Sequence, residues 1–501
     1  MSDRYIDGTI FRAALKETVE KLHDKREALN RINVFPVPDG DTGNNLLATL
    51  ESAYHETEKS ASSSLHTIAQ AAYQGAREGS TGNSGAIFAQ YLRGWAVACS
   101  NLEKVGAGEV SAAQTLGTKY AYGAVLKPVE GTILTVARKA AEAAEKEVPG
   151  KNLTNTLAAS YHQARRTLVK TAKVLPVLRD QKIIDAGGWG LLIFISAILS
   201  VMDIPTGKAE FNFKAGSNYC KSRDDFQFDH PYDMEFVIKA TSNIEPVIRR
   251  IFKDCGSELI TQINQGHCHV HIHTDNPLDI AERSAKLGNI SAIIIRDMRA
   301  QYYSMAGQQR SNIQYKAVAI GKSPGFLAMF AMAGAQVAVS KSMLNKKIRV
   351  LEEYNADNDL IISSEQIEFP LLSESVLVVE EEARILASLV SLYSPEKPTP
   401  EVIREAADYP RITALIRKND HFMILTNSSP GYEGNHRDCL YQAVSLLKPQ
   451  IGEVLTLYYG QPADRKKLEA LLPGLKKKFP ALETIDLYYG GQEIPLILSI
   501  E

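Results

Sequence analysis

The segment between residues 33 and 45, NVFPVPDGDTGNN, constrains this chain more than any other. Two carboxylates, Asp39 and Asp41, flank one glycine, and a second glycine follows just before a helical pattern. Carboxylate oxygens are ligands that Mg²⁺ prefers, and glycines allow tight backbone geometry. A helix that begins near Thr42 would offer free N–H groups and a positive dipole end to an anion. The segment therefore predicts a metal–phosphate site, although a Pro/Asp/Gly turn that only caps a helix uses the same residue types.

Length, charge and cysteine content limit the class of protein. A chain of 501 residues is expected to form two to four domains. Its net charge of −2 argues against nucleic acid or an anionic membrane as a partner. The five cysteines are scattered and form no CxxC pair, which fits a reducing compartment. The N-terminus is polar, and the longest apolar stretch, residues 191–202, is too short to span a bilayer and reads as a buried helix. We therefore expect a cytoplasmic protein without stable membrane insertion.

The residue pattern changes twice along the chain, so that three domains are expected. Residues 1–203 show helical spacing of apolar residues and nothing that reads as a sheet. Residues 204–310 alternate strand-like and helix-like segments, which predicts a small α+β domain. Residues 311–501 contain strands separated by helical segments, which predicts an α/β domain with a largely parallel sheet.

Three further glycine-rich junctions precede helical patterns in the first domain. They are GSTGNSG at residues 79–85, KPVEGT at residues 127–132 and DAGGWG at residues 185–190. Any one of them is commonly a helix cap with its loop. Four such helix starts in one all-α domain suggest more, because antiparallel helices can bring them to one end. Backbone N–H groups gathered there can hold phosphates, so a nucleotide with its metal ions is predicted across that end.

The middle domain contains four alternating histidines in HCHVHIH, residues 267–273. On a strand, all four point to one face, while Cys268 points to the opposite face and is expected in the core. Alternate histidines on a strand can place imidazoles for zinc, but a solvated polar strand face gives the same pattern.

The four junctions resemble the signature loops of the dihydroxyacetone-kinase L-type domain. More narrowly, they resemble the version in the ATP-binding subunit of bacterial fatty acid kinase. The resemblance continues through VHIHTDNP and the C-terminal strings EVLTLYYG and LYYGGQEIPLILSIE. It covers nearly the entire chain in the same order. The resemblance implies an eight-helix barrel in residues 1–203 that holds ATP and two Mg²⁺ ions at its loop end.

The resemblance also assigns residues to the nucleotide site. It implies that Asp39 and Asp41 are the catalytic residues and Mg²⁺ ligands, with Asn33 as a third ligand. Thr81 stands where the family usually has an arginine, which removes one positive charge from the phosphate site. The implied nucleotide contacts are Thr42, Gly43, Asn44, Asn45, Asn83, Ser84, Gly85, Thr132, Asp185, Gly187 and Gly188.

For the histidine-rich strand, the resemblance favours His271 and His273 as zinc ligands. The family usually adds a cysteine from a Tyr-Cys-x-Glu-Phe strand, and here the matching position is Asp233. A carboxylate in place of a thiolate gives the site a chemically harder ligand. His269 lies beside the pair on the same face and is expected to compensate.

The implied reaction is transfer of the γ-phosphate of ATP to a fatty acid carboxylate, which gives an acyl phosphate. A fatty acid is ionised at neutral pH, so no general base is required, and catalysis reduces to alignment and charge neutralisation. The family carries the fatty acid on a separate binding protein. We assign the C-terminal domain to partner docking or dimerisation and expect a homodimer.

Two alternatives remain open: a non-catalytic nucleotide-binding regulatory or scaffold protein, and a subunit of a glycerone-type kinase. Thr81, Asp233 and the altered segment SKSMLNKKIRV at residues 340–350 favour the first of these. Both aspartates and the three later loops favour a kinase.

Overall fold

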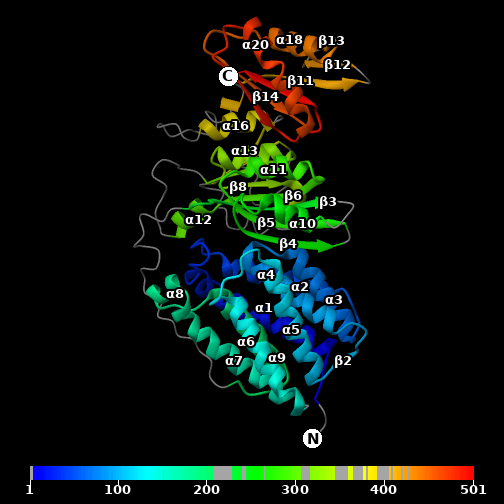
Figure 1. Cartoon of the computed structure of the whole chain (residues 1–501), viewed down its shortest axis with the longest axis vertical. Helices are drawn as coiled ribbons and strands as arrows, with labels where there is room; N and C mark the ends of the chain where they lie inside the picture. The colour runs from blue at the N-terminus through cyan, green and yellow to red at the C-terminus, as the bar shows by residue number, and fades with distance from the viewer. Residues whose placement is uncertain are drawn as a thin grey trace. The chain divides into compact units, whose positions relative to one another are not determined.

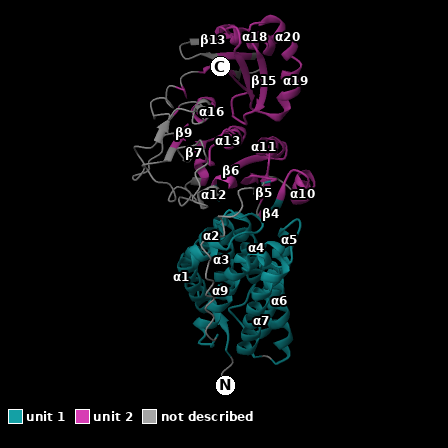
Figure 2. Ribbon diagram, turned by 90° about the vertical axis from the view of Figure 1, so that its left-hand side faces the viewer, with its two compact units in different colours: residues 1–228, 258–262, 301–308 teal, residues 229–257, 263–300, 309–501 magenta. Residues whose placement is uncertain are grey.

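The computed structural model of the chain forms two compact units, which are considered separately (Figures 1 and 2). Unit 1 comprises residues 1–228, 258–262 and 301–308, and unit 2 comprises residues 229–257, 263–300 and 309–501. The structure describes residues 4–150, 152–206, 228–239, 244–264, 266–305, 316–344, 359–364, 376–379, 382–391, 406–407, 410–418, 421–426 and 429–500.

Residues 4–206 are helical, as the sequence predicts. Each long helix contacts the next one along the chain, and α9 also contacts α1 (Figure 1). One two-residue ladder, β1 (Ile6–Asp7) with β2 (Lys104–Val105), was not predicted. The described helices are α1 (Gly8–Arg31), α2 (Thr42–Glu58), α3 (Leu65–Gly79), α4 (Gly82–Ala98), α5 (Ala107–Ala124), α6 (Ile133–Glu147), the 3₁₀ turn η1 (Val148–Gly150), α7 (Leu153–Val174), α8 (Pro176–Gln181) and α9 (Ala186–Val201).

The core of these helices is organised around Phe194 on α9. Its ring lies 5.6 Å from that of Phe88, 6.2 Å from those of Phe11 and Trp95, and 6.4 Å from that of Tyr91, measured between centroids. All four contacts are close to perpendicular, the arrangement that places a positive ring edge against a negative ring face. Helix α9 carries apolar residues on all sides, as expected for a helix that is buried on most of its faces. The prediction of a buried helix at residues 191–202 is confirmed.

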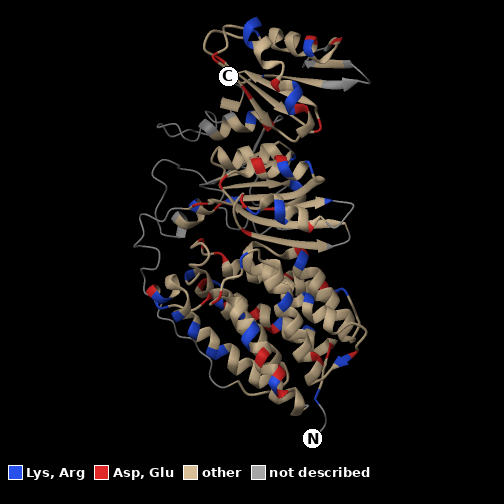
Figure 3. Ribbon diagram, in the orientation of Figure 1, with Lys and Arg blue, Asp and Glu red and all other residues tan. Residues whose placement is uncertain are grey.

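Charged residues of both signs are interspersed along the outer faces of the helices of unit 1 (Figure 3). Pairs one turn apart include Glu17 with Lys21 at 2.7 Å and Arg138 with Glu142 at 2.9 Å. Pairs of this kind contribute only about 0.3–0.5 kcal/mol each, so the stability of unit 1 depends mainly on its core. No helix in the described part of the chain is both long and apolar enough to cross a membrane.

Removal of the central ring tests this account of the core. Phe194→Ala is expected to lower the free energy of unfolding by about 3–5 kcal/mol, because a large cavity replaces a side chain that four rings contact. Val169→Ala is the matched control: Val169 on α7 is 50% exposed, and a change of less than about 0.5 kcal/mol is expected. Denaturant unfolding followed by near-ultraviolet circular dichroism measures both. Equal effects of the two substitutions would show that the ring cluster is not central to the core.

An eight-stranded sheet in the order β10-β9-β7-β8-β6-β3-β5-β4 lies in unit 2, except that residues 258–262 of β4 belong to unit 1. Strand β6, with apolar residues on both faces, pairs antiparallel with β3 on one side and β8 on the other. The sheet continues across residue 310, where the sequence predicts a domain boundary, so the three-domain division stays a prediction. The strands are β3 (Tyr232–Lys239), β4 (Ser257–Asn264), β5 (His267–Thr274), β6 (Asn289–Asp297), β7 (Lys316–Gly321), β8 (Val337–Ser340), β9 (Asp359–Ser363) and β10 (Val376–Val378).

Helices accompany this sheet along the chain. Helices α11 and α13 both contact β6 and also contact each other. The segment at residues 340–350 is described only as far as the end of α14, and its remainder lies outside the described residues. The helices are α10 (Glu245–Phe252), α11 (Pro277–Ala285), α12 (Met298–Met305), α13 (Pro324–Met332), α14 (Lys341–Leu344) and α16 (Glu382–Ser391).

The last part of the chain forms a six-stranded sheet in the order β13-β12-β11-β16-β14-β15. Only β14 and β15 are parallel neighbours; the other described pairs are antiparallel. The prediction of a largely parallel sheet is therefore wrong here, because connections as short as that between β11 and β12 join antiparallel strands. The elements are β11 (Arg411–Lys418), β12 (His421–Thr426), β13 (Ser429–Gly434), α18 (His436–Leu446), β14 (Val454–Tyr459), η2 (Pro462–Asp464), α19 (Arg465–Glu469), α20 (Leu472–Lys478), β15 (Thr484–Tyr489) and β16 (Leu496–Ile500).

Candidate functional site

The four glycine-containing junctions lead into α2, α4, α6 and α9, and the fold brings these helix starts together. A Cβ atom added at Gly82, the first residue of α4, would lie 2.2 Å from Nδ2 of Asn45 in the first turn of α2. A Cβ atom added at Gly190, near the start of α9, would lie 2.3 Å from Cδ1 of Leu46 near the start of α2. One added at Gly187 would lie 3.3 Å from Cβ of Ile133, the first residue of α6. The helix starts therefore meet, as expected for antiparallel helices that present alternate loops at one end.

Asp185 links two of these starts directly. Its carboxylate accepts a hydrogen bond from the N–H of Gly188 at 2.6 Å, as the N-cap of α9. It also accepts one from the backbone of Ile133, the first residue of α6. Thr132, the N-cap of α6, accepts from the N–H of Leu134 at 3.3 Å. Asp185 and Thr132 thus hold the starts of α6 and α9. The contacts with the nucleotide that the resemblance implied for both residues stay a prediction.

The turn that carries the two aspartates is closed by Asn33. Its amide donates to Oδ1 of Asp39 at 2.5 Å, and its oxygen accepts from the hydroxyl of Thr42. Asn33 and Thr42 are buried, while Asp39 and Asp41 are half-buried. Asn33 therefore orients one of the two carboxylates. Its proposed role as a third metal ligand remains a prediction.

Asn30, on the last turn of α1, was missed by sequence reasoning. Its side-chain oxygen accepts from the N–H of Gly43 at 2.7 Å and from that of Asn44 at 3.2 Å. The prediction that the start of α2 offers free N–H groups is therefore wrong for these two residues. No local pattern could reveal this cap, because Asn30 lies 13 residues before Gly43.

The start of α4, like that of α2, has an N-cap residue for which no side-chain cap hydrogen bond is found in the described structure. The N-cap of α4, Thr81, is buried. Asn83 and Ser84 in the first turn are half-buried. The guanidinium of Arg77, near the end of α3, lies 5.8 Å from the ring centroid of Tyr73, one turn earlier on the same helix.

Burial makes the carboxyl group of Asp185 a weaker acid than an ordinary aspartate. It raises the pKa of Asp185 from 3.8 to about 6, although the N–H groups of Gly188 and Ile133 oppose the rise. The folded protein therefore binds this proton more tightly than the unfolded chain does. Between about pH 4 and pH 6, the free energy of unfolding is expected to fall as the pH rises. The contribution of Asp185 is fully present below its unfolded pKa and is lost above its folded pKa.

Asp185→Asn tests this pH dependence. An asparagine oxygen can still accept from Gly188, but it carries no charge to bury. From pH 4 to pH 6, the free energy of unfolding should therefore fall by about 2 kcal/mol less than in the wild type. Asp180→Asn, at an exposed aspartate on α8, is expected to keep the wild-type pH dependence. Denaturant titrations at several pH values decide the matter, and identical pH profiles for Asp185→Asn and wild type would refute the assignment.

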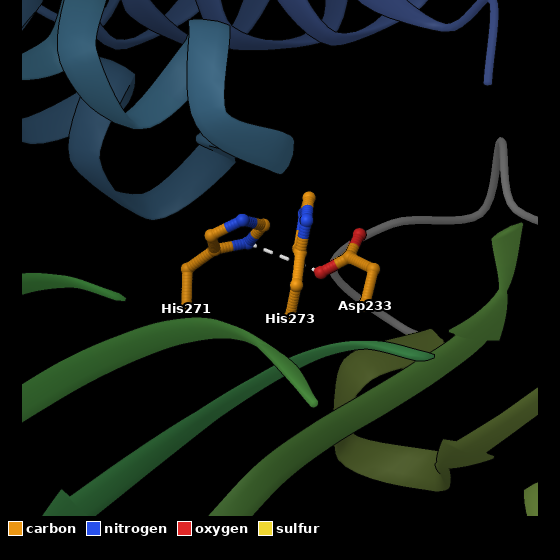
Figure 4. Close-up of side chains that lie close together, drawn as sticks. All are labelled: Asp233, His271 and His273. Atoms are coloured by element: carbon orange, nitrogen blue, oxygen red, sulfur yellow. Dashed lines mark ion pairs between the residues drawn. The ribbon is translucent and has the colours of Figure 1, made fainter. Parts of the chain in front are cut away.

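In unit 2, Asp233, His271 and His273 form a cluster that could hold a metal ion. The antiparallel register of β3 and β5 sets Asp233 opposite His273. One potential ligand atom from each residue lies within 4.8 Å of the others, and all three residues are buried (Figure 4). Oδ1 of Asp233 lies 3.1 Å from Nδ1 of His271. The donor set of two imidazoles and one carboxylate fits a divalent transition metal.

Burial and neighbouring charges set the protonation of the residues in this cluster. Burial lowers the pKa of His273 to about 3, so the imidazole is neutral, as a metal ligand must be. Burial alone would raise the pKa of Asp233, but His271 and Arg296 hold it below its ordinary value. Nη1 of Arg296 lies 3.2 Å from Oδ2 of Asp233 and 3.0 Å from Oε1 of Glu235. Oδ1 of Asp233 thus faces His271, whereas Oδ2 faces Arg296.

The remaining residues of the histidine-rich strand lie apart from the cluster. His269 is only partly buried and pairs with Val237, and it is not among the residues that converge. The expectation that His269 compensates for the missing cysteine therefore gains no support. Cys268 is buried on the opposite face of β5, as its position in the alternation predicts.

Comparison with known proteins identifies the class. Residues 36–200 match the DAK2 domain, and residues 229–305 match the middle domain of FakA-like fatty acid kinase subunits. The first match spans the turn of Asp39 and Asp41 and all four helix starts, and the second spans the Asp233 cluster. The chain is therefore a kinase of the DAK2-domain class. Within that class, its middle domain is similar to that of FakA-like fatty acid kinase subunits.

Several relatives match over nearly the whole of this chain. The chain is 26% identical to protein YloV of Bacillus subtilis, with 99% of each chain covered. It is 25% identical to an uncharacterized protein of Staphylococcus epidermidis and 23% identical to one of Staphylococcus aureus, with 98% of each chain covered in both cases. Among solved structures, the dihydroxyacetone kinase of C. freundii matches with 14% identity and a TM-score of 0.29, over 38% of this chain and 34% of that one. A similarity that low carries no argument here.

Proposed function

We propose that this chain is the ATP-dependent subunit of a two-component kinase, which transfers the γ-phosphate to a fatty acid carboxylate presented by a separate binding protein. The observation that carries the proposal is the turn of Asp39 and Asp41, closed by Asn33 and Asn30 beside three further helix starts. The match of the middle domain to FakA-like fatty acid kinase subunits favours a fatty acid over a glycerone-type acceptor.

Each residue has a distinct task in this proposal. Asp39 and Asp41 hold two Mg²⁺ ions, which supply charge neutralisation at the phosphates. Asn33 orients Asp39, while Asp185 fixes the starts of α6 and α9. The start of α4, with Ser84 in its first turn, is assigned to phosphate. The acceptor carboxylate is ionised at neutral pH, so the chain needs no general base.

The acceptor comes from outside in this proposal. The aromatic rings around Phe194 pack against that ring in the core of the unit 1 helices. We therefore assign this core to structural packing and not to binding of the acceptor. A partner that presents the carboxylate would supply the alignment that a free fatty acid lacks. The eight-helix barrel, the three domains, the homodimer, the docking role of the C-terminal domain and the cytoplasmic location belong to the same proposal.

A regulatory protein that binds nucleotide without turnover is the second candidate. The observation that favours it is Thr81 at the N-cap of α4, where an uncharged side chain stands in place of arginine. The two candidates differ in whether the γ-phosphate is transferred to a lipid acceptor.

Substitution of the aspartates tests the kinase proposal. Asp39→Ala or Asp41→Ala should lower Mg²⁺-dependent phosphoryl transfer at least ~100-fold, because metal ions supply several kcal/mol of charge stabilisation. Helical content should not change. Asp180→Ala, which removes an exposed carboxylate of the same unit, is expected to keep full activity. Transfer from labelled ATP in the presence of a lipid-loaded binding protein is the assay, and near-wild-type turnover in either aspartate variant would exclude the assigned metal role.

We also propose that Asp233, His271 and His273 hold one zinc ion. Elemental analysis of the purified chain should then find about one zinc per chain, and His273→Ala should lose it. His269→Ala is the matched control, since it removes an imidazole from the same strand outside the cluster. A wild-type protein without zinc, with thermal stability unchanged by a chelator, would contradict this assignment.

A further inference from the structure

We propose that Asn30 is a positioning residue for phosphoryl transfer, which fixes the backbone of the metal-binding turn from the neighbouring helix α1. Its side chain is buried, with 8% of its surface exposed. Its oxygen accepts from the N–H groups of Gly43 and Asn44, and its Nδ2 lies 3.2 Å from Oδ1 of Asn44. One amide group therefore makes three hydrogen bonds to the first turn of α2.

The backbone around this contact is closely packed. A Cβ atom added at Gly43 would lie 2.3 Å from the carbonyl oxygen of Arg26 and 2.7 Å from Oδ1 of Asn30. The start of α2 thus rests directly on the last turns of α1. Since helix α1 is long and its inner face is buried in the core, it provides a rigid support for the turn.

Asn30 and Asn33 hold the turn from both ends. Asn33 bonds to Asp39 before the helix begins, while Asn30 bonds to Gly43 and Asn44 just after Asp41. Two carboxylates that share metal ions repel each other when the ions are absent. A turn held at both ends keeps them in place against that repulsion, so that metal binding does not have to order the backbone first.

A second consequence concerns phosphate. The N–H groups of Gly43 and Asn44 donate to Asn30 and are therefore not available to an anion. In this scheme the turn contributes the carboxylates of Asp39 and Asp41 to the site, but not these two backbone donors. Asn30 therefore acts through the metal ions in this scheme, which rests on the proposed kinase function. Its loss should change the dependence on Mg²⁺ and leave metal-free nucleotide binding unchanged.

Asn30→Ala tests the proposal against Asn152→Ala. Asn152 is a matched control: it caps α7 by accepting from the N–H of Asn155 at 3.0 Å, and α7 follows none of the four junctions. Both substitutions remove a helix cap and should lower the melting temperature. Only Asn30→Ala is expected to raise the Mg²⁺ concentration for half-maximal activity about tenfold or more, as loss of a residue that supports metal ligands typically does.

The outcomes separate this proposal from the function it rests on. If Asp39→Ala loses activity while Asn30→Ala keeps the Mg²⁺ dependence of Asn152→Ala, the role of Asn30 is wrong and the kinase proposal stands. If Asp39→Ala remains active, the proposed metal site itself fails. Should Asn30→Ala not fold, as judged by circular dichroism, Asn30→Ser takes its place, and an unchanged Mg²⁺ dependence in that variant overturns the proposal. Calorimetry with ATP in chelator, expected to be unchanged, completes the test.

Discussion

The hydrogen bonds between the end of α1 and the start of α2 are the constraint on which the proposed site depends. Two carboxylates must stay close together in a short turn, and their mutual repulsion opposes this. The amide groups of Asn30 and Asn33 hold that turn on both sides, because each can donate and accept at once. Neutral amides do so without adding a charge that would compete with Mg²⁺ or with phosphate.

At the starts of α6 and α9, Asp185 plays the corresponding part with a charged side chain. A buried carboxylate accepts from Gly188 and Ile133, and its raised pKa records the cost of burying a charge there. The fold tolerates this cost because one side chain connects the starts of α6 and α9. Since all four starts meet, a shift in any one of them would move the groups of the proposed nucleotide site.

Some of these features could be predicted from sequence, and particular elements show why. The helical character of residues 4–206 and the burial of α9 follow from apolar spacing, which is a local property. The placement of His271 and His273 on one face follows from the alternation of side chains on a strand. The position of Asp233 depends on the register between β3 and β5, and only the resemblance to a known family supplied it.

What could not be predicted depends on contacts between distant segments. Asn30 caps a helix other than its own, and β6 pairs with β8 across the boundary expected at residue 310. The mostly antiparallel six-stranded sheet also depends on pairings such as β11 with β16, which are far apart in the sequence. Local periodicity carries no information about partners of this kind.

The central claim is that this chain transfers phosphate only to an acceptor that a partner presents. The most direct test mixes the purified chain with ATP, Mg²⁺ and oleate, either free or loaded on a fatty-acid-binding protein, and traps acyl phosphate as its hydroxamate. We expect hydroxamate only with the loaded protein, because the partner supplies the alignment of the carboxylate. Rapid formation of hydroxamate from free oleate by the isolated chain would contradict this account.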